Sequence, residues 1–527
     1  MTLSEILPRA ASLWPEQAAE TCGSYEFTYR EVSDRVGRLA TALVKLGVTA
    51  GDRVAILHRN CHRMLEAYFA AVHAGAILVP MNHRLTAGDL AYILDDTSCR
   101  VMIADDGWCD LATEAITTTH TRCTLIWSAM GGRTERAVDG PDYEGLVEEV
   151  GEHALPDAAS SEDDPANIYY TSGTTGHQKG VVLTHRNISS HALATIDELA
   201  LSNCDTWGHV APMFHLADAW ATWAITWVGG HHVMVGAFDP AVVYQTFVDR
   251  GVTVTNLVPT MLNDLINHPG SGDIRLPAFR LVMSGGAPIS PQLVRRVIDT
   301  FGCEYVQTYG LTETSPYLTF SLLKEHLRRL PPEDQLRYRS MTGRPALGVE
   351  LRLVDEEGND VPADGRSVGE IVARGDRITP GYWQLSNATA EAFRDGWFHT
   401  GDLATVEGEG YFNIVDRKKD VILTGGELVY STEVENALYD HPAVFEAAVI
   451  GVADDRLGEK VVAFVVLKPG SSCSTGDLAS HCRDHLAHYK CPRTIELIDA
   501  LPKTGSGKIS KKTLRESWSE DSFSSRA

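Results

Sequence analysis

The sequence predicts a multidomain α/β fold. We expect a large N-terminal domain of stacked, mostly parallel sheets with flanking helices and a β-rich subdomain, followed by a small, mobile α+β domain. Short apolar runs rich in β-branched residues, such as 53–58 and 100–105, alternate with amphipathic stretches, and this alternation is typical of parallel sheets. After about residue 345 the pattern changes to a turn-rich β segment. Beyond the charged stretch 416–420, a helix and two strands are predicted.

The composition is that of an acidic globular enzyme. The 527 residues carry 70 acidic and 46 basic side chains, a formal net charge of −24. This excess argues against a nucleic-acid partner, whose binding needs a basic face. No two of the ten cysteines have CxxC spacing, so neither a zinc site nor a dithiol redox site is indicated. There is no signal-peptide pattern and no run of roughly 18 apolar residues that could span a bilayer. We therefore expect a cytoplasmic protein without a membrane span.

The strongest local signal is the loop Tyr170–Gly180, which lies between two apolar runs. Three glycines and four hydroxyl residues fall within its eleven positions. Backbone N–H groups and hydroxyls of such a loop can surround phosphate oxygens, and Lys179 adds a positive charge. It is not a Walker A loop, because its glycines do not fit GxxxxGK[ST]. The predicted phosphate-binding residues are Thr171, Ser172, Gly173, Thr174, Thr175, Gly176 and Lys179.

Four further motifs follow this loop in the chain. They are MSGGAPIS at 283–290, QTYGLTET at 307–314, a long stretch from GWFHTGDL to STEVE at 396–435, and PKTGSGKI at 502–509. Together the five motifs resemble, in order and spacing, the adenylate-forming superfamily of acyl-CoA synthetases, firefly luciferase and peptide-synthetase adenylation domains. The resemblance implies an N-terminal AMP-binding domain at 1–416 with a β-rich subdomain at about 345–416, a hinge at 417–419, a C-terminal lid domain at 420–515 and a flexible tail at 516–527.

The motif at 307–314 offers an aromatic face, a hydroxyl and a carboxylate within the five residues from Tyr309 to Glu313. An adenine can stack on Tyr309, beside Gly310, while Thr312 can bond a phosphate. Glu313 can hold Mg²⁺, which bridges phosphate oxygens, and Thr175 is the second residue predicted at the metal.

The other nucleotide contacts come from two more motifs. Gly286, Ala287 and Pro288 carry little side chain, so a purine can lie against their backbone as in the family's adenine pocket. Asp402 is suited to accept both ribose hydroxyls, because a carboxylate takes two hydrogen bonds at once. Arg417 is matched to a second ribose or phosphate contact.

The resemblance also implies a mechanism in two half-reactions. A carboxylate attacks the α-phosphorus of MgATP to give acyl-AMP and pyrophosphate, and Lys508 offsets the charge that develops. The small domain then rotates about Lys419 and brings the loop of Gly425, Gly426 and Glu427 in to line a channel for CoA.

The segment 207–227 is matched to the family's acyl pocket. His215 falls at a position near the substrate carboxylate, where peptide-synthetase domains have an Asp for an α-ammonium group, so α-amino acids are disfavoured. Some of the four tryptophans in this segment can wall a pocket for a medium-chain or an aryl or arylalkenyl acid, although ordinary helix core accounts for at least two. The predicted acyl-pocket residues are Phe214, His215, Asp218, Trp220, Gly285 and Tyr309.

The acceptor is predicted less directly than adenylation. CoA is the first choice, but Leu428 stands in the thiol-channel loop where relatives often have Asn. A carrier-protein thiol, oxygen, or nitrite and amine chemistry as in an ATP-dependent diazotase remain alternatives. A non-catalytic nucleotide-binding regulator would have lost Glu313 or Lys508, and both are present. The expected partners are a small carboxylic acid and CoA, and a homodimer is left open.

Overall fold

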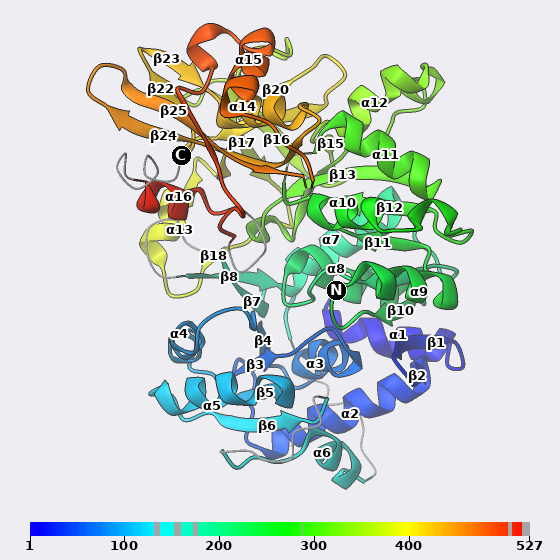
Figure 1. Cartoon of the computed structure of the whole chain (residues 1–527). Helices are drawn as coiled ribbons and strands as arrows, with labels where there is room; N and C mark the ends of the chain where they lie inside the picture. Colours follow the sequence, from blue (N-terminus) through cyan, green and yellow to red (C-terminus); the bar gives the residue numbers. More distant parts are fainter. Residues whose placement is uncertain are drawn as a thin grey trace.

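The computed structural model of the protein describes residues 1–130, 138–151, 160–171, 178–287, 289–468, 470–503 and 509–518. Two large mixed sheets, each mostly parallel, build the N-terminal part, and two five-stranded sheets follow them (Figure 1). The α/β class, with a large N-terminal domain and a smaller C-terminal one, is therefore confirmed.

The nine-stranded sheet carries the strands that end at two of the predicted nucleotide motifs. It is parallel from β13 to β1 and antiparallel at its margins. Its strands, in spatial order, are β15 (Arg344–Pro345), β14 (Tyr317–Phe320), β13 (Glu304–Gly310), β12 (Leu281–Ser284), β11 (Val254–Asn256), β9 (Thr206–His209), β10 (His231–Met234), β1 (Ala18–Cys22) and β2 (Tyr25–Thr28).

The seven-stranded sheet carries the glycine-rich loop. Its five strands from β7 to β6 run parallel, whereas β7 and β8 form an antiparallel hairpin around that loop. In spatial order they are β18 (Gly381–Tyr382), β8 (Lys179–Thr184), β7 (Pro165–Thr171), β4 (Ile77–Pro80), β3 (Arg53–Leu57), β5 (Val101–Asp105) and β6 (Thr124–Ser128).

Two smaller sheets are built from strands between residues 350 and 497. The first, wholly antiparallel, consists of β16 (Glu350–Val354), β17 (Gly369–Arg374), β20 (Trp397–Val406), β19 (Phe393–Arg394) and β21 (Phe412–Arg417). The second consists of β23 (Glu427–Val429), β22 (Ile422–Thr424), β25 (Gly458–Leu467), β24 (Val444–Asp454) and β26 (Thr494–Leu497). A β-rich segment after about residue 345 and a helix–strand–strand unit beyond it were both predicted, and the structure shows both.

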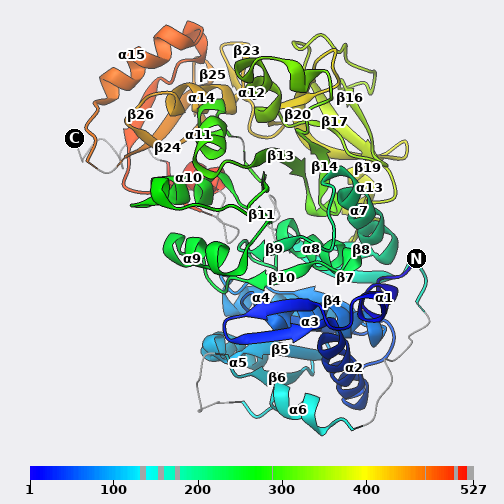
Figure 2. The same cartoon turned by 90° about the vertical axis from the view of Figure 1, so that its right-hand side faces the viewer.

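Sixteen α-helices are found in the described part of the chain, and most of them flank the sheets (Figures 1 and 2). They are α1 (Ile6–Leu13), α2 (Tyr29–Lys45), α3 (His62–His73), α4 (Ala87–Thr97), α5 (Cys109–Thr118), α6 (Tyr143–Glu149), α7 (His185–Glu198), α8 (Leu216–Val228), α9 (Pro240–Arg250), α10 (Pro259–Asn267), α11 (Pro291–Phe301), α12 (Pro332–Ser340), α13 (Ser386–Ala392), α14 (Ser431–Tyr439), α15 (Thr475–His485) and α16 (Lys511–Ser517).

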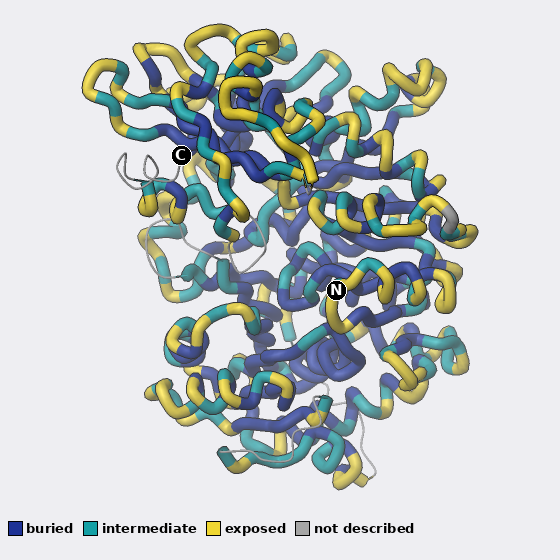
Figure 3. The backbone as a smooth tube through the Cα atoms, viewed as in Figure 1, coloured by how far each residue is buried: buried dark blue, intermediate teal, exposed yellow. Residues whose placement is uncertain are grey.

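The main core lies between the two large sheets. Every residue of α3 and nearly every residue of α8 is buried, and Figure 3 shows this interior in dark blue. Apolar side chains of both helices pack in one cluster with strand residues of both sheets, such as Ile56 and Met283. A helix that is buried on all sides belongs in such a core. The site elements are thereby fixed to a rigid frame.

Local sequence explains how α11 begins after the predicted adenine loop. The Ser290 side chain accepts a hydrogen bond from the N–H of Leu293, and Pro291 occupies the first turn. A serine cap and a proline at this position both favour helix initiation. The start of α11 is therefore set directly after this loop.

One buried carboxyl makes stability depend on pH. Glu20 is 0% exposed and neither of its oxygens has a hydrogen-bond partner among the described residues. Burial raises the pKa of Glu20 well above its ordinary 4.5, and the nearby Glu66 raises it further, against the opposing charge of Arg35. The folded protein therefore keeps a proton that the unfolded chain releases above this value, so stability must fall as pH rises through this range.

We expect Glu20→Gln to raise the melting temperature at about pH 8 and to leave it unchanged at about pH 4, because the neutral amide removes this proton linkage. Thermal unfolding across that range measures it. The exposed Glu26 provides the control, since Glu26→Gln should shift melting little at any pH. Destabilisation by Glu20→Gln at about pH 8 would instead mean that the carboxylate is ionised and paired.

Candidate active site

The carboxyl ends of β12 and β13, which are parallel neighbours, form one wall of the candidate site. A Cβ at Gly285 would lie 2.4 Å from Thr308 Oγ1, and Gly286 has a φ of +82°. Both positions therefore require glycine. The backbone of Gly285, Gly286 and Ala287 follows β12, and Tyr309 lies at the end of β13. Such a wall of bare backbone and one aromatic ring suits a flat purine.

Tyr309, Asp402 and Arg417 meet in this structure. The Tyr309 hydroxyl donates to Asp402 Oδ2 at 2.8 Å, and Arg417 Nε lies 3.2 Å from Asp402 Oδ1. Asp402 and Arg417 are cross-strand partners on β20 and β21. Loss of solvent and the neighbouring Asp402 raise the pKa of Tyr309 well above its usual value, so its proton stays available for donation. The structure thus brings together three predicted nucleotide contacts from two motifs, 307–314 and 396–435.

Glu313 lies one turn beyond β13, in a short 3-10 turn that starts at Thr312. Its side chain is buried, and Tyr382 donates a hydrogen bond to Glu313 Oε1 at 3.0 Å. Burial raises the pKa of Glu313, while Tyr382, Arg417 and Lys179 lower it. Arg417, which pairs with Asp402, is one of the charges that oppose this rise.

Gly310 leaves no room for a side chain between Tyr309 and this turn. A Cβ there would lie 1.8 Å from the carbonyl oxygen of Pro316. This steric requirement explains the glycine without reference to a ligand.

The base of the glycine-rich loop lies beside Tyr382, the residue that bonds Glu313. Thr171 and Lys179 are opposite each other at the ends of β7 and β8, and Lys179 Nζ lies 5.0 Å from the centre of the Tyr382 ring. Lys179 therefore sits beside the residue that bonds Glu313. The predicted phosphate-binding residues Ser172, Gly173, Thr174, Thr175 and Gly176 lie outside the described residues, as does Pro288 of the purine wall.

The residues at Glu313 fit a magnesium ion that arrives with nucleotide phosphates. Mg²⁺ usually takes one or two carboxylates and completes its shell with phosphate oxygens and water. Glu313 supplies one buried carboxylate near the base of the phosphate loop. Within the part of the chain that the structure describes, no group of three or more acidic, histidine or cysteine side chains could hold a metal alone. The phosphates would therefore supply most of the ligands.

Phe214 and His215 stand at the start of α8, where His215 is the N-cap residue. Their rings are 4.6 Å apart. The Phe214 ring also meets His83 edge-on at 5.0 Å, and His83 stacks on Trp108 at 4.2 Å. These rings form an aromatic cluster, in which Phe214 is only 4% exposed, next to the residue predicted to face the substrate carboxylate.

Asp218 and Trp220, further along α8, are also buried. Asp218 is 0% exposed, and its carboxylate bonds His209 Nδ1 at 2.6 Å and Trp207 Nε1 at 3.3 Å. Trp220 is 1% exposed and donates to the Ala217 carbonyl at 3.1 Å. Both side chains therefore have partners inside the protein, and their predicted contact with the acid stays a prediction.

The predicted CoA-channel residues form a tight turn between β22 and β23. Gly425 and Gly426 have φ values of +61° and +87°, as a two-residue hairpin of this kind requires. Glu427 is exposed beside them. Leu423 and Leu428 are cross-strand partners on this hairpin and are 51% and 54% exposed. The departure noted at Leu428 is thus part of an exposed apolar pair.

The predicted hinge and the predicted catalytic lysine differ in how far the structure describes them. Lys419 is exposed, two residues after the end of β21. Asp416, near the end of that strand, accepts hydrogen bonds from the N–H and hydroxyl of Ser431 at the start of α14. Lys508 lies outside the described residues, but its loop is closed at its base by a bridge between Lys503 and Ile509.

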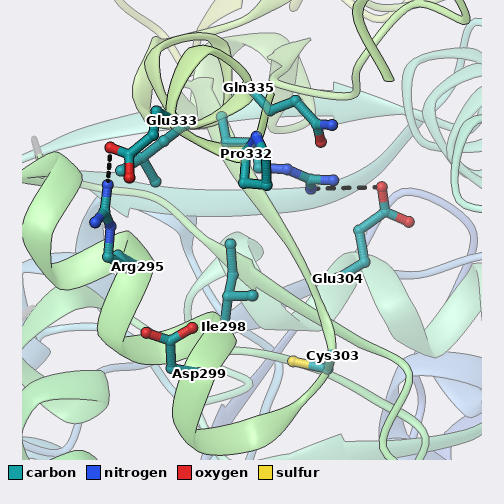
Figure 4. A pocket seen from close by; sticks show the side chains of 10 residues that line it. Arg295, Ile298, Asp299, Cys303, Glu304, Pro332, Glu333 and Gln335 are labelled. Carbon is teal, nitrogen blue, oxygen red and sulfur yellow. Dashed lines mark hydrogen bonds and ion pairs between the residues drawn. The ribbon is translucent and has the colours of Figure 1, made fainter. Parts of the chain in front are cut away.

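A surface pocket of about 370 Å³ between α11 and α12 does not belong to the site (Figure 4). Its charged walls are already paired: Arg295 lies 2.6 Å from Glu333, and Arg339 lies 3.6 Å from Glu304. None of the predicted site residues lines it.

Tyr382 was not predicted, yet it contacts two residues of the site. It comes from β18, 69 positions from Glu313 in the chain, and belongs to none of the five motifs. No sequence pattern marks it, because its role arises from the antiparallel pairing of β18 with β8.

Comparison with known proteins agrees with this geometry. The family model described as "AMP-binding enzyme" matches residues 7–383, and "AMP-binding enzyme C-terminal domain" matches 433–508. A feruloyl-CoA synthase of an Amycolatopsis species is 37% identical over 508 residues, covering 96% of this chain and 97% of that protein. A long-chain-fatty-acid–CoA ligase of Thermus thermophilus is 38% identical over 528 residues, covering 98% and 96%.

Solved structures give the same result. ATP-bound MatB from Rhodopseudomonas palustris superimposes with a TM-score of 0.86 at 30% identity, covering 98% of this chain and 99% of that one. The anthranilate CoA ligase AuaEII in complex with anthranoyl-AMP reaches 0.86 at 26% identity, covering 98% and 97%.

The fold and the site define an adenylate-forming enzyme. The chain belongs to the AMP-binding enzyme family and is an AMP-forming acyl-CoA synthetase, as its five motifs predicted. Among the described residues, no helix is both long and apolar enough to cross a bilayer.

Proposed function

We propose that the chain activates a medium-chain, aryl or arylalkenyl carboxylic acid with ATP and transfers the acyl group to CoA. The observation that carries this is a convergence of residues at the base of the glycine-rich loop. Tyr309 and Arg417 contact Asp402, and Tyr382 links Glu313 to Lys179. Supporting names among the relatives are a feruloyl-CoA synthase and a medium-chain-fatty-acid–CoA ligase.

In the first half-reaction, the described residues bind and orient ATP. Asp402 accepts from the ribose hydroxyls, and Arg417 and Tyr309 already hold its carboxylate in place. Such preorganisation lowers the entropy cost of positioning the α-phosphorus. Lys179 draws the phosphates toward Glu313, which would hold Mg²⁺. When bound, the ion neutralises phosphate charge.

The bond changes then balance without a covalent enzyme intermediate. An oxygen of the substrate carboxylate forms a bond to the α-phosphorus, and the bond from that phosphorus to pyrophosphate breaks. Lys508 offsets the negative charge at the reacting oxygens. In the second step a thiolate attacks the acyl carbon, AMP leaves, and the thiol proton passes to solvent.

The acid is proposed to lie against the aromatic cluster of Phe214, His83 and Trp108. Flat aromatic faces favour aryl and unsaturated acids through ring contacts, and they also accept alkyl chains. His215 at the start of α8 is placed to meet the carboxylate. The absence of an Asp at this position disfavours an α-ammonium group.

Between the two steps, the C-terminal domain is proposed to rotate at 417–419, with 1–416 and 420–515 as the two bodies and 516–527 as a tail. A cleft of about 780 Å³ is lined by residues of α11 and α12 together with Asn413 and Asn436. The two proposed bodies are therefore not packed tightly against each other at this place. The rotation has to release the bonds between Asp416 and Ser431, and it brings Gly425 and Gly426 toward the acyl-adenylate.

A carrier-protein thiol is the second candidate acceptor. CoA and carrier proteins both offer a thiol on a flexible arm, and the exposed Leu423 and Leu428 pair suits an apolar section of either.

The test is a panel of acids, each incubated with MgATP, with and without CoA. We expect pyrophosphate release with ferulate-like and medium-chain acids, little with α-amino acids, and thioester by mass spectrometry only when CoA is present. Hydroxylamine trapping of the adenylate provides the control for acids that react slowly. Pyrophosphate release without thioester would move the proposal to the carrier protein. No release with any acid would contradict it.

A further inference from the structure

Two buried asparagines make similar sets of contacts to two segments that lead into the candidate site. Asn60 follows β3, and Asn187 is the third residue of α7. Each is 5% exposed. Each uses its amide oxygen and nitrogen to make three hydrogen bonds to the main chain. The pair is therefore matched in residue type, burial and bonding, and differs in the segment that it holds.

Asn60 holds the chain that leads into α8. Its Nδ2 donates to the carbonyls of His209 at 2.9 Å and Ala211 at 2.8 Å, and its Oδ1 accepts from the Met213 N–H at 2.8 Å. The Tyr68 hydroxyl donates to the Met213 carbonyl at 2.7 Å. Both main-chain polar groups of Met213 are thus fixed by side chains that belong to the layer of the other large sheet.

The next residues after Met213 are Phe214 and His215, which form the acyl side of the site. A tight turn follows, because the N–H of His215 bonds the carbonyl of Pro212 at 3.0 Å. The position of His215 therefore depends on a short segment whose other anchor is Asn60.

Asn187 holds the chain that leads into β18. Its Nδ2 donates to the carbonyls of Asp376 at 2.7 Å and Ile378 at 2.9 Å, while its Oδ1 accepts from the Thr184 N–H at 2.9 Å. The following residue, Thr379, donates its N–H to the Glu313 carbonyl at 2.8 Å.

Three residues further on, the Tyr382 hydroxyl reaches Glu313 Oε1 at 3.0 Å. The segment 376–382 thus donates hydrogen bonds to both the backbone carbonyl and the carboxylate of Glu313. Asn187 anchors that segment to the helix that directly follows β8, and β8 starts at Lys179.

We propose that Asn60 and Asn187 are positioning residues that divide the site between the two substrates: Asn60 fixes the acyl side through 209–215, and Asn187 fixes the ATP side through 376–382. Neither side chain contacts a reacting atom. Each acts through main-chain groups that would otherwise be buried without partners, and such groups relax toward other contacts when the bond is lost. This inference rests on the proposed function for its substrates, but not for its geometry.

The test is a crossed comparison of Asn60→Ala with Asn187→Ala in the full chain. Because misplacement of about 1 Å can cost as much as 10²-fold, we expect Asn60→Ala to raise KM for the acid by about ten-fold and to leave KM for ATP within about two-fold. We expect the reverse for Asn187→Ala. Equal shifts in both KM values for both variants would overturn the division.

Hydrogen exchange read by mass spectrometry separates this proposal from the proposed function. Asn60→Ala should speed amide exchange in 209–215 but not in 376–382, and Asn187→Ala should do the opposite. This pattern without turnover on any acid would support the bracing and refute the proposed function. Exchange that rises alike in both segments would overturn the bracing even in an active enzyme.

A milder variant guards against loss of folding. Tyr68→Phe removes the bond to the Met213 carbonyl and keeps the ring packed in the core. It should shift KM for the acid in the same direction as Asn60→Ala, by a smaller factor. An unchanged KM for the acid in Tyr68→Phe, together with an altered KM for ATP, would contradict the role of this segment.

Discussion

Lys508→Ala is expected to slow adenylation by about 10²- to 10³-fold, because it removes the cation that offsets charge at the reacting oxygens. Thioester formation from supplied acyl-adenylate should stay within a few-fold of the unaltered enzyme, since the proposed rotation takes Lys508 away from the site before the thiol reacts. Rapid-quench assays of the two half-reactions measure both rates separately.

Lys468 gives a matched control for this variant. It is an exposed lysine of the same domain, and its Nζ donates to the Pro442 carbonyl at 2.7 Å, so Lys468→Ala should leave both half-reactions unchanged. Equal loss of both half-reactions in Lys508→Ala would argue that the lysine serves one fixed site and that the domain does not alternate.

Asp402→Ala is expected to weaken ATP binding by about 10²-fold or more. Hydrogen bonds to a charged group contribute about 1.5–3 kcal/mol each, and Asp402 is proposed to accept from two ribose hydroxyls. The variant also leaves Tyr309 and Arg417 without the partner that orients them. Isothermal titration with ATP, in the absence of acid, reads this directly.

Asp364→Ala controls for a change in the β-rich sheet. Asp364 is exposed. The hydrogen bonds that the structure shows for its carboxylate come from Arg366 and Ser367 in the same turn. It should bind ATP like the unaltered chain. Unchanged ATP affinity in Asp402→Ala would remove Asp402 from the nucleotide site.

The motifs predicted which residues meet, and the structure supplies how they meet. Tyr309 lies in one motif and Asp402 and Arg417 lie in another, but the meeting of all three follows from β20 pairing with β21 next to the end of β13. Sequence spacing cannot give such a contact across 93 residues. It depends on the packing of the β-rich sheet against the nine-stranded one.

Other features had no sequence signal at all. Tyr382, Asn60 and Asn187 act through long-range bonds to one carboxylate or to main-chain groups, and such bonds leave no local pattern. Asp218 shows the opposite case. It was predicted to line the acyl pocket, and in the structure its carboxylate bonds His209 and Trp207, so a contact with the substrate stays a prediction. Buried polar groups are almost always hydrogen-bonded, and nearby side chains can supply the partners instead of a substrate.

The central claim is that this chain makes an acyl-adenylate and then a thioester. The acid panel tests it most directly when the best acid is used in a single turnover, with CoA withheld and then added. The account predicts that acyl-AMP and pyrophosphate appear in equal amounts before CoA, and that CoA then converts the adenylate to thioester with release of one AMP. Formation of ADP and phosphate, or an adenylate that persists after CoA is added, would contradict it.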